Sequence, residues 1–252
     1  YSLSQNASLF IYYLFLFFLG SILMRSAGCI VNDLVDKDFD IKVQRTKNRP
    51  IASKKISIKK SLLYVIILCF LAFIVLIQFN LLTVCLGIGS MIPAFLYPYM
   101  KRITYWPQLF LGITFNWGII MAWTATNNGI SIEIILLYLS AIFWTLGYDT
   151  IYGAQDMSDD EIIGLKSTSI KFKKNIQLFT FICYLFFSAL IIFIFKDYFG
   201  KNYFSFLMII FISTLIYQLV KLKKNSKDFL KLFKINNYTG LFLFLSICSI
   251  NL

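Results

Sequence analysis

Eight long apolar segments constrain this chain more than any other feature. Hydrophobic residues make up 59% of the sequence and charged residues 14%, against about a quarter in soluble domains. We expect each segment to cross the roughly 30 Å of hydrocarbon in a bilayer, for which a helix of about 20 residues is typical. The segments are residues 8–31, 62–79, 81–100, 109–126, 132–154, 176–195, 204–220 and 238–252.

The apolar segments also limit the fold class. Backbone polar groups in lipid must be satisfied within the segment, which favours helices, and a strand barrel would require an alternating pattern that these continuous runs lack. The sequence therefore predicts an all-α, polytopic membrane helix bundle with eight transmembrane helices. No linker or low-complexity tract divides residues 1–252, so we expect one integral membrane domain.

The basic residues are distributed unequally between the two sides of the predicted bundle. If the segments alternate across the membrane, 21 of the 24 Lys and Arg residues fall on one side and two on the other. This asymmetry assigns the Lys- and Arg-rich side to the cytoplasm. It also explains the net charge of +12 without a nucleic-acid partner. We expect a bacterial inner-membrane protein in contact with membrane lipid.

Nine of the twelve acidic residues lie in two short parts of the chain. The first acidic stretch is residues 32–40, directly after the first apolar segment. The second acidic stretch is residues 149–161, at the end of the fifth. Both stretches fall on the predicted cytoplasmic side. Acidic residues at a membrane face are often only solvated loop charge, but two such clusters on one side favour a shared function.

The spacing within each stretch predicts carboxylates on one helical face. Near the C-terminal end of a helix, the macrodipole and the repulsion between like charges both oppose such clusters, so a compensating cation is indicated. Histidine is absent, which excludes His ligands and His general bases. Oxygen ligands of this kind suit Mg²⁺. The residues with this spacing are Asn32, Asp36 and Asp40 in the first stretch and Asp149, Gly153, Asp156 and Asp160 in the second.

Basic residues follow both stretches and close the third apolar segment. Carboxylates that hold a metal, surrounded by Arg and Lys, are typical of a diphosphate site. At the membrane surface, this combination favours a lipid diphosphate whose tail lies among the helices. A cation or lipid transporter is the alternative, although it would place its ionisable groups nearer the bilayer midplane. The basic residues concerned are Arg45, Lys47, Arg49, Lys54, Lys55, Lys101, Arg102 and Lys166.

Several motifs resemble signatures of the membrane-embedded aromatic prenyltransferases of the UbiA superfamily. The first signature covers residues 24–33 with Asp36, Asp40 and residues 47–50. The middle signature covers residues 97–102 with 107–108, and the second acidic signature covers residues 147–152 with Asp156, residues 159–160 and residues 164–168. Residues 236–241 resemble the start of the family's C-terminal helix. The signatures are most similar to the branch that prenylates 4-hydroxybenzoate.

The resemblance implies nine transmembrane helices around a cavity and two Mg²⁺ ions that hold the diphosphate. By position, the metal ligands would be Asn32, Asp36, Asp40, Asp156 and Asp160. Lys101 and Arg102 would contact the diphosphate or the aromatic acid, with Arg49, Lys47, Lys166 and Tyr152 as further substrate contacts. Gly153 stands where alanine is usual, and we expect this exchange to be tolerated. The family's first helix is not found before Ser8. We expect that helix to contribute part of the aromatic-acid pocket.

The resulting hypothesis is Mg²⁺-dependent transfer of a polyprenyl group from polyprenyl diphosphate to 4-hydroxybenzoate, at the carbon ortho to the hydroxyl, in ubiquinone biosynthesis. Asp36, Asp40, Asp156 and Asp160 would serve catalysis through the metals. Asp156 or, less favourably, Asp149 would draw electron density from the phenol; alternatively, Asp149 is purely structural and packs against Tyr152. Naphthoate, homogentisate and haem are alternative acceptors.

Overall fold

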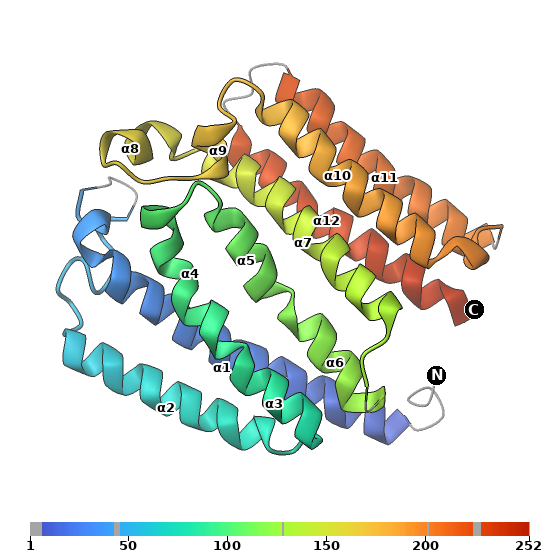
Figure 1. Ribbon diagram of the computed structural model, residues 1–252, viewed down its shortest axis with the longest axis horizontal. Coiled ribbons are helices and arrows are strands. Elements are labelled where there is room, and N and C mark those ends of the chain that lie inside the picture. The colour runs from blue at the N-terminus through green and yellow to red at the C-terminus, as the bar shows by residue number, and fades with distance from the viewer. Residues whose placement is uncertain (1–6, 43–45, 128, 201, 224–227, 252) are drawn as a thin grey trace. The chain divides into compact units, whose positions relative to one another are not determined.

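The computed structural model describes residues 7–42, 46–127, 129–200, 202–223 and 228–251. Most of these residues are helical and none of them lies in a strand, which confirms the all-α prediction (Figure 1). Two short 3-10 helices accompany the α-helices, Lys196–Tyr198 and Ser249–Asn251. The α-helices are α1 (Ala7–Asp40), α2 (Ile58–Leu76), α3 (Leu81–Gly89), α4 (Met91–Ile103), α5 (Pro107–Phe115), α6 (Trp117–Asn127), α7 (Ile132–Gly153), α8 (Met157–Ile162), α9 (Thr168–Lys171), α10 (Ile176–Ile194), α11 (Asn202–Lys223) and α12 (Phe229–Cys248).

Seven stretches of helix within the described residues are long and apolar enough to cross a membrane. They correspond to the first seven predicted segments. The eighth, residues 238–252, lies largely within α12, which begins earlier, at Phe229. The first turns of α12 carry Lys231, Lys234 and two asparagines. The apolar part of α12 that remains is therefore too short to count as a membrane-spanning stretch. The spans are Ser8–Asp40, Ile58–Leu76, Leu81–Ile103, Pro107–Asn127, Ile132–Gly153, Ile176–Ile194 and Tyr203–Leu222.

The chain forms two compact units. Unit 1 comprises Tyr1–Met100 and Trp117–Ile134, and unit 2 comprises Lys101–Asn116 and Ile135–Leu252. The first acidic stretch belongs to unit 1 and the second to unit 2. Two helices are divided between the units: α4 has its last three residues, Lys101–Ile103, in unit 2, and α7 has its first three, residues 132–134, in unit 1.

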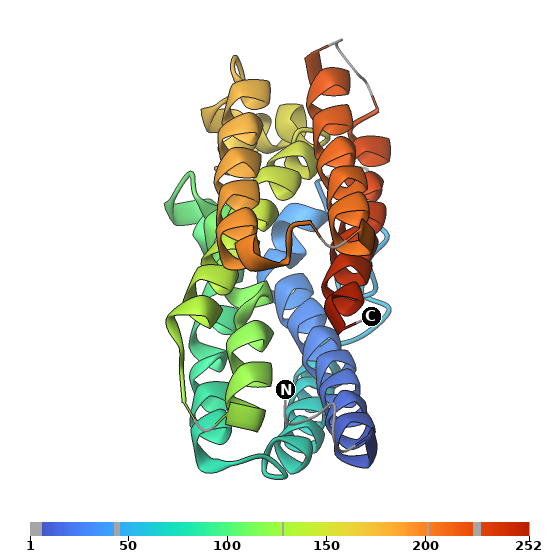
Figure 2. The ribbon, with the colours of Figure 1, turned by 90° about the vertical axis from the view of Figure 1, so that its right-hand side faces the viewer.

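In unit 1, α1 and α2 pack along each other, as both views show (Figure 1, Figure 2). Asn80 joins α3 to α6: its side chain accepts a hydrogen bond from Thr83 N–H at 2.9 Å and donates to Thr124 O at 2.6 Å. The hydroxyls of Thr83 and Thr124, both fully buried, are 2.9 Å apart. These bonds satisfy polar groups that would otherwise be costly in an apolar surrounding.

Two of the predicted segments are each broken into two helices. Residues 81–100 divide at Ser90, between α3 and α4, and residues 109–126 divide at Asn116, between α5 and α6. The Asn116 amide donates hydrogen bonds to Gly112 O at 2.8 Å, Ala141 O at 3.2 Å and Thr145 Oγ1 at 2.8 Å. The break at Asn116 thus has partners on α7, within unit 2.

Unit 2 has an apolar core drawn from α7, α10, α11 and α12. A buried polar network crosses this core at Gln218 of α11. Tyr184 Oη donates to Gln218 Oε1 at 2.8 Å, and the Asn236 amide donates to the same oxygen at 3.2 Å. Trp144 Nε1 also donates to Asn236 Oδ1, at 3.0 Å. The core consists of Ile151, Tyr184, Phe187, Ile191, Phe204, Met208, Phe211, Leu215 and Leu232.

Candidate active site

The first acidic stretch is the end of α1, which continues without a break to Asp40. Asn32, Asp36 and Asp40 therefore lie on one helical face, as their spacing predicts. Asn32 is half-buried, whereas Asp36 and Asp40 are only 1% and 7% exposed. Two carboxylates buried at the end of an apolar helix need compensation from cations or hydrogen-bond donors.

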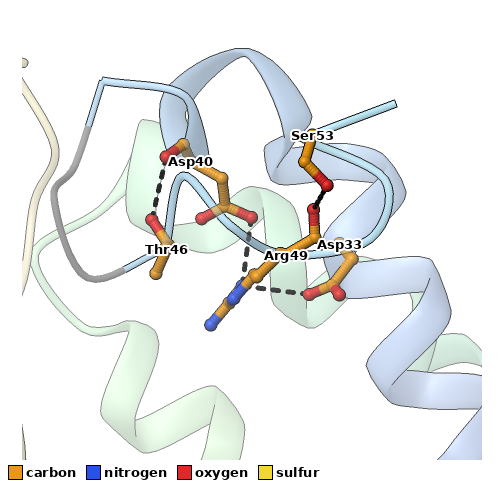
Figure 3. A network of polar contacts seen from close by, with 5 residues as sticks. All are labelled: Asp33, Asp40, Thr46, Arg49 and Ser53. Atoms are coloured by element: carbon orange, nitrogen blue, oxygen red, sulfur yellow. Dashed lines mark hydrogen bonds and ion pairs between the residues drawn. The ribbon is translucent and has the colours of Figure 1, made fainter. Parts of the chain in front are cut away.

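The turns that follow α1 supply one such cation. Arg49 Nη1 lies 3.0 Å from Asp33 Oδ1 and 3.1 Å from Asp40 Oδ2 (Figure 3). Thr46 Oγ1 donates to the backbone carbonyl of Asp40 at 3.0 Å, and Ser53 Oγ donates to that of Arg49 at 2.8 Å. Residues 46–53 thus lie against the end of α1, with Arg49 shared between two of its carboxylates.

The second acidic stretch is not one continuous helix, so the prediction of a single face from Asp149 to Asp160 is wrong. Helix α7 ends at Gly153, a turn follows, and α8 begins anew after Asp156. Asp149 is half-buried within α7, while Asp159 and Asp160 occupy the first turn of α8. The positive end of a helix dipole favours carboxylates there, so the expected electrostatic opposition does not apply to Asp159 and Asp160.

Uncharged side chains fix the end of α7 within unit 2. The hydroxyls of Thr150 and Thr168 are 2.6 Å apart, and Ser169 Oγ donates to Thr150 O at 2.7 Å. Gln108 Oε1 accepts from Thr168 N–H at 3.0 Å. A Cβ at Gly153 would lie 2.7 Å from Ser169 Oγ, so this glycine leaves the space that Ser169 fills.

The predicted substrate contacts are divided between the units. In unit 2, the Lys166 N–H donates to Lys101 O at 2.8 Å and Lys166 Nζ donates to Ile103 O at 3.1 Å, which places Lys166 beside the end of α4. Lys101 and Arg102 are half-buried there. In unit 1, Lys47, Lys54 and Lys55 are exposed, and Arg45 lies outside the described residues. The Tyr152 ring packs against Phe233, with centroids 4.7 Å apart.

This arrangement of carboxylates and cations can be compared with known proteins. The profile of the UbiA prenyltransferase family matches residues 1–238. The chain belongs to the UbiA prenyltransferase family. It is an integral membrane protein with the helical fold of that family.

Two UbiA relatives illustrate the similarity. The mitochondrial 4-hydroxybenzoate polyprenyltransferase of Rattus norvegicus is 48% identical over 165 residues, which cover 65% of this chain and 44% of the rat protein. The chain thus spans less than half the length of that relative. The 4-hydroxybenzoate octaprenyltransferase of Blochmanniella pennsylvanica is 38% identical over 240 residues, which cover 94% of this chain and 82% of that protein.

Solved UbiA structures agree in fold. The apo structure of a UbiA homolog from Aeropyrum pernix K1 has a TM-score of 0.81 at 21% identity and covers 94% of this chain and 89% of its own. The structure of a UbiA homolog from Archaeoglobus fulgidus bound to GPP and Mg²⁺ has a TM-score of 0.70 at 19% identity, with 96% and 88% covered. At these identities the likeness shows the fold alone.

The UbiA fold raises the question of whether these residues suit Mg²⁺. Among the described residues, no group of three or more His, Cys, Asp or Glu side chains lies close enough together to hold a metal ion. Magnesium, however, usually takes one or two carboxylates and completes its shell with waters and substrate phosphates. Arg49 contacts one oxygen of Asp33 and one of Asp40, and each carboxylate offers about four lone-pair positions. The donor set therefore fits Mg²⁺.

The structure adds residues that the sequence interpretation left out of the UbiA site. Asp33 shares Arg49 with Asp40, although the helical spacing alone did not select it. Gln108, Thr150 and Ser169 are uncharged and were not selected as site residues, although Gln108 and Thr150 lie within the motifs at residues 107–108 and 147–152. The expected start of the C-terminal helix at Asn236 is wrong, because α12 begins at Phe229 and the Asn236 amide is bonded inside the bundle.

Proposed function

We propose that this chain transfers a polyprenyl group from polyprenyl diphosphate to 4-hydroxybenzoate, as a step in ubiquinone biosynthesis. The observation that carries the proposal is the relative from Blochmanniella pennsylvanica, a 4-hydroxybenzoate octaprenyltransferase similar over 94% of this chain. The grouping of carboxylates at the ends of α1 and α7 is consistent with that chemistry. Family membership also favours prenyl transfer over the alternative of transport. We treat residues 1–252 as one prenyltransferase domain.

The site residues keep the roles that the motifs predict. We assign Asn32, Asp36, Asp40, Asp156 and Asp160 as the ligands that would hold Mg²⁺, which neighbours of this fold bind together with GPP or DMAPP. The bound metal would neutralise charge on the departing diphosphate. Arg49, Lys47, Lys101, Arg102 and Lys166 are proposed to contact the diphosphate or the aromatic acid, and Tyr152 to border the prenyl group.

The reaction breaks two bonds, the allylic carbon–oxygen bond and one ring carbon–hydrogen bond, and forms one carbon–carbon bond. The carbon–oxygen bond of the allylic diphosphate breaks, and its electron pair leaves with the diphosphate. The ring carbon ortho to the hydroxyl attacks the allylic carbon, and the proton on that ring carbon then passes to the released diphosphate or to water. The Lys and Arg side chains stabilise the negative charge that grows on the leaving group. A carboxylate, Asp156 or Asp149, is proposed to accept a hydrogen bond from the phenol hydroxyl, which raises the electron density of the ring.

Asp→Asn variants assayed in isolated membranes test the metal ligands. Asp36→Asn and Asp156→Asn should each lower product formation by a hundredfold or more if they hold the metal that stabilises the leaving group, since removal of one electrostatic stabiliser costs about 10²–10³ in rate. Asp228→Asn is the matched control, because Asp228 is exposed and its ion pair among the described residues is with Lys231, three residues away. Full activity in both site variants would remove the metal assignment.

The acceptor is tested separately. Mass spectrometry of membranes given polyprenyl diphosphate and equal amounts of 4-hydroxybenzoate, a naphthoate and homogentisate should find the prenylated 4-hydroxybenzoate. Prenylation of another acceptor, with none of 4-hydroxybenzoate, would move the proposal to a different member of the same family.

We also propose that the ends of α1 and α7 that carry the acidic stretches face the cytoplasm across a bacterial inner membrane. The distribution of Lys and Arg between the two sides supports this orientation. A cysteine introduced at Lys47, which is exposed, should react with a membrane-impermeant thiol reagent in inverted vesicles and not in intact spheroplasts. The opposite pattern would reverse the orientation.

A further inference from the structure

The connection between α9 and α10 forms a basic recess in unit 2. The recess has a volume of about 390 Å³ and is lined by six consecutive residues, of which three are lysines. All three lysines are exposed. The proposed reaction gives this recess no role. Its lining residues are Ile170, Lys171, Phe172, Lys173, Lys174 and Asn175.

The position of the recess along the chain places it at the level of lipid headgroups. Helix α10 begins at Ile176, directly after the recess, and is one of the helices long and apolar enough to cross a membrane. A lysine within a few residues of the start of such a span is held where the hydrocarbon ends. Trp106 directly precedes α5, which opens another candidate span, and tryptophan is enriched at this level.

Aromatic rings hold the recess in a fixed shape. The rings of Phe172 and Phe179 are stacked with centroids 4.0 Å apart, and Trp106 packs edge-on against both at 5.9 and 6.1 Å. Lys171 Nζ lies 4.4 Å from the centre of the Trp106 ring. This cation–π contact fixes the side chain of Lys171 over an apolar platform.

Within the described part of the chain, the charge of the recess is only partly neutralised. Lys173 pairs with Glu161 at 2.6 Å, with both side chains partly exposed, while neither Lys171 nor Lys174 has a carboxylate partner among the described residues. A loop that only sets membrane topology needs positive charge but no recess and no stacked platform. Basic pockets beside transmembrane helices are typical sites for anionic lipid headgroups.

We propose that this recess binds the headgroup of an anionic phospholipid of the surrounding bilayer. Lys171, Lys173 and Lys174 would contact the phosphate, and the rings of Trp106 and Phe172 would lie against the start of the acyl chains. The lipid is bound as a partner and is not a substrate. The inference does not depend on the proposed function.

Native mass spectrometry of the detergent-purified protein, titrated with phosphatidylglycerol, tests the proposal. The wild type should retain phosphatidylglycerol in preference to phosphatidylcholine with the same acyl chains. A triple variant should lose that preference, with about a tenfold to hundredfold lower affinity for phosphatidylglycerol, because three cations at headgroup level are removed. The triple variant is Lys171→Gln with Lys173→Gln and Lys174→Gln.

A second triple variant controls for charge alone. Lys42, Lys59 and Lys60 are exposed, and Lys59 and Lys60 lie in the first turn of α2, another candidate span that begins at Ile58. Their change to Gln removes the same charge and should leave the preference for phosphatidylglycerol intact. An equal loss in both triple variants, or no loss in the recess variant, would overturn the proposal.

Two further measurements separate the remaining outcomes. Excess inorganic phosphate should not displace phosphatidylglycerol, and displacement would indicate a free-phosphate site instead. Trp106→Phe keeps every charge but weakens the cation–π platform, so the affinity for phosphatidylglycerol should fall about threefold to tenfold. Circular dichroism and gel filtration of each variant establish that it is folded, and an unchanged affinity in a folded Trp106→Phe protein would refute the role of the platform.

Discussion

The contact of Arg49 with two carboxylates can be tested by its removal. Arg49→Met keeps much of the side-chain length and deletes two charge-assisted hydrogen bonds, at 3.0 and 3.1 Å. Hydrogen bonds to charged groups contribute about 1.5–3 kcal/mol each when sheltered from water. The Arg49 side chain is 32% exposed and that of Asp33 is 24% exposed, so solvent screens part of this energy. We expect Arg49→Met to lower the free energy of unfolding by about 2 kcal/mol in total.

Thermal unfolding in detergent, followed with a thiol-reactive dye, measures this effect. The chain has five free cysteines, and the buried Cys183 becomes reactive when the bundle opens. If the melting entropy is that of a soluble chain of similar length, the midpoint should fall by about 4–8 °C. Lys231→Met is the control, because its ion pair with Asp228 is largely exposed and is worth less than about 1 kcal/mol. Equal shifts in both variants would refute the reasoning.

The same unfolding assay checks three further substitutions. Gln218→Leu removes interhelical hydrogen bonds to three side chains on α10 and α12, each worth about 0.6 and at most about 1.7 kcal/mol in membranes, so we expect a loss of about 2 kcal/mol. Gly147→Ala places a Cβ 2.6 Å from a ring carbon of the buried Tyr184 and should destabilise the protein by about 1–3 kcal/mol. Its control is Gly28→Ala, whose Cβ meets open space and should stabilise the protein by up to about 1 kcal/mol. Gly153→Ala should lower the midpoint less in a Ser169→Ala background, where the crowded oxygen is gone, than in the wild type; equal shifts in the two backgrounds would contradict the crowding.

The positions of most helices could be predicted from the sequence because one physical requirement decides them. An apolar run in lipid must satisfy its backbone internally, so each run becomes a helix whatever its neighbours are. The run from Ile176 illustrates this, since the predicted and observed starts coincide. The end of α1 at Asp40 was likewise implied by the spacing of its polar residues.

The helix breaks and polar contacts could not be predicted in the same way, because they depend on partners distant in sequence. Asn116 interrupts an apolar run, and its amide is satisfied by Ala141 and Thr145 on α7. Nothing in the run itself signals those acceptors. Asp33 forms an ion pair because Arg49, sixteen residues further along the chain, lies beside it. Hydropathy and helical spacing carry no information of this kind.

The two acidic stretches differ in helix electrostatics, and the same substitution should therefore have opposite effects on them. Asp38 is exposed in the last turn of α1, at the negative end of the helix dipole, whereas Asp159 is exposed in the first turn of α8, at a positive end. Neither residue belongs to the proposed metal ligands. At low ionic strength, Asp38→Asn should raise and Asp159→Asn should lower the free energy of unfolding, each by about 0.3–1 kcal/mol. Both effects should shrink at 1 M salt, where the Debye length is about 3 Å. Shifts of the same sign in low salt would contradict the assignment of Asp159 to a new helix start, and would favour the continuous helix that the sequence spacing predicted.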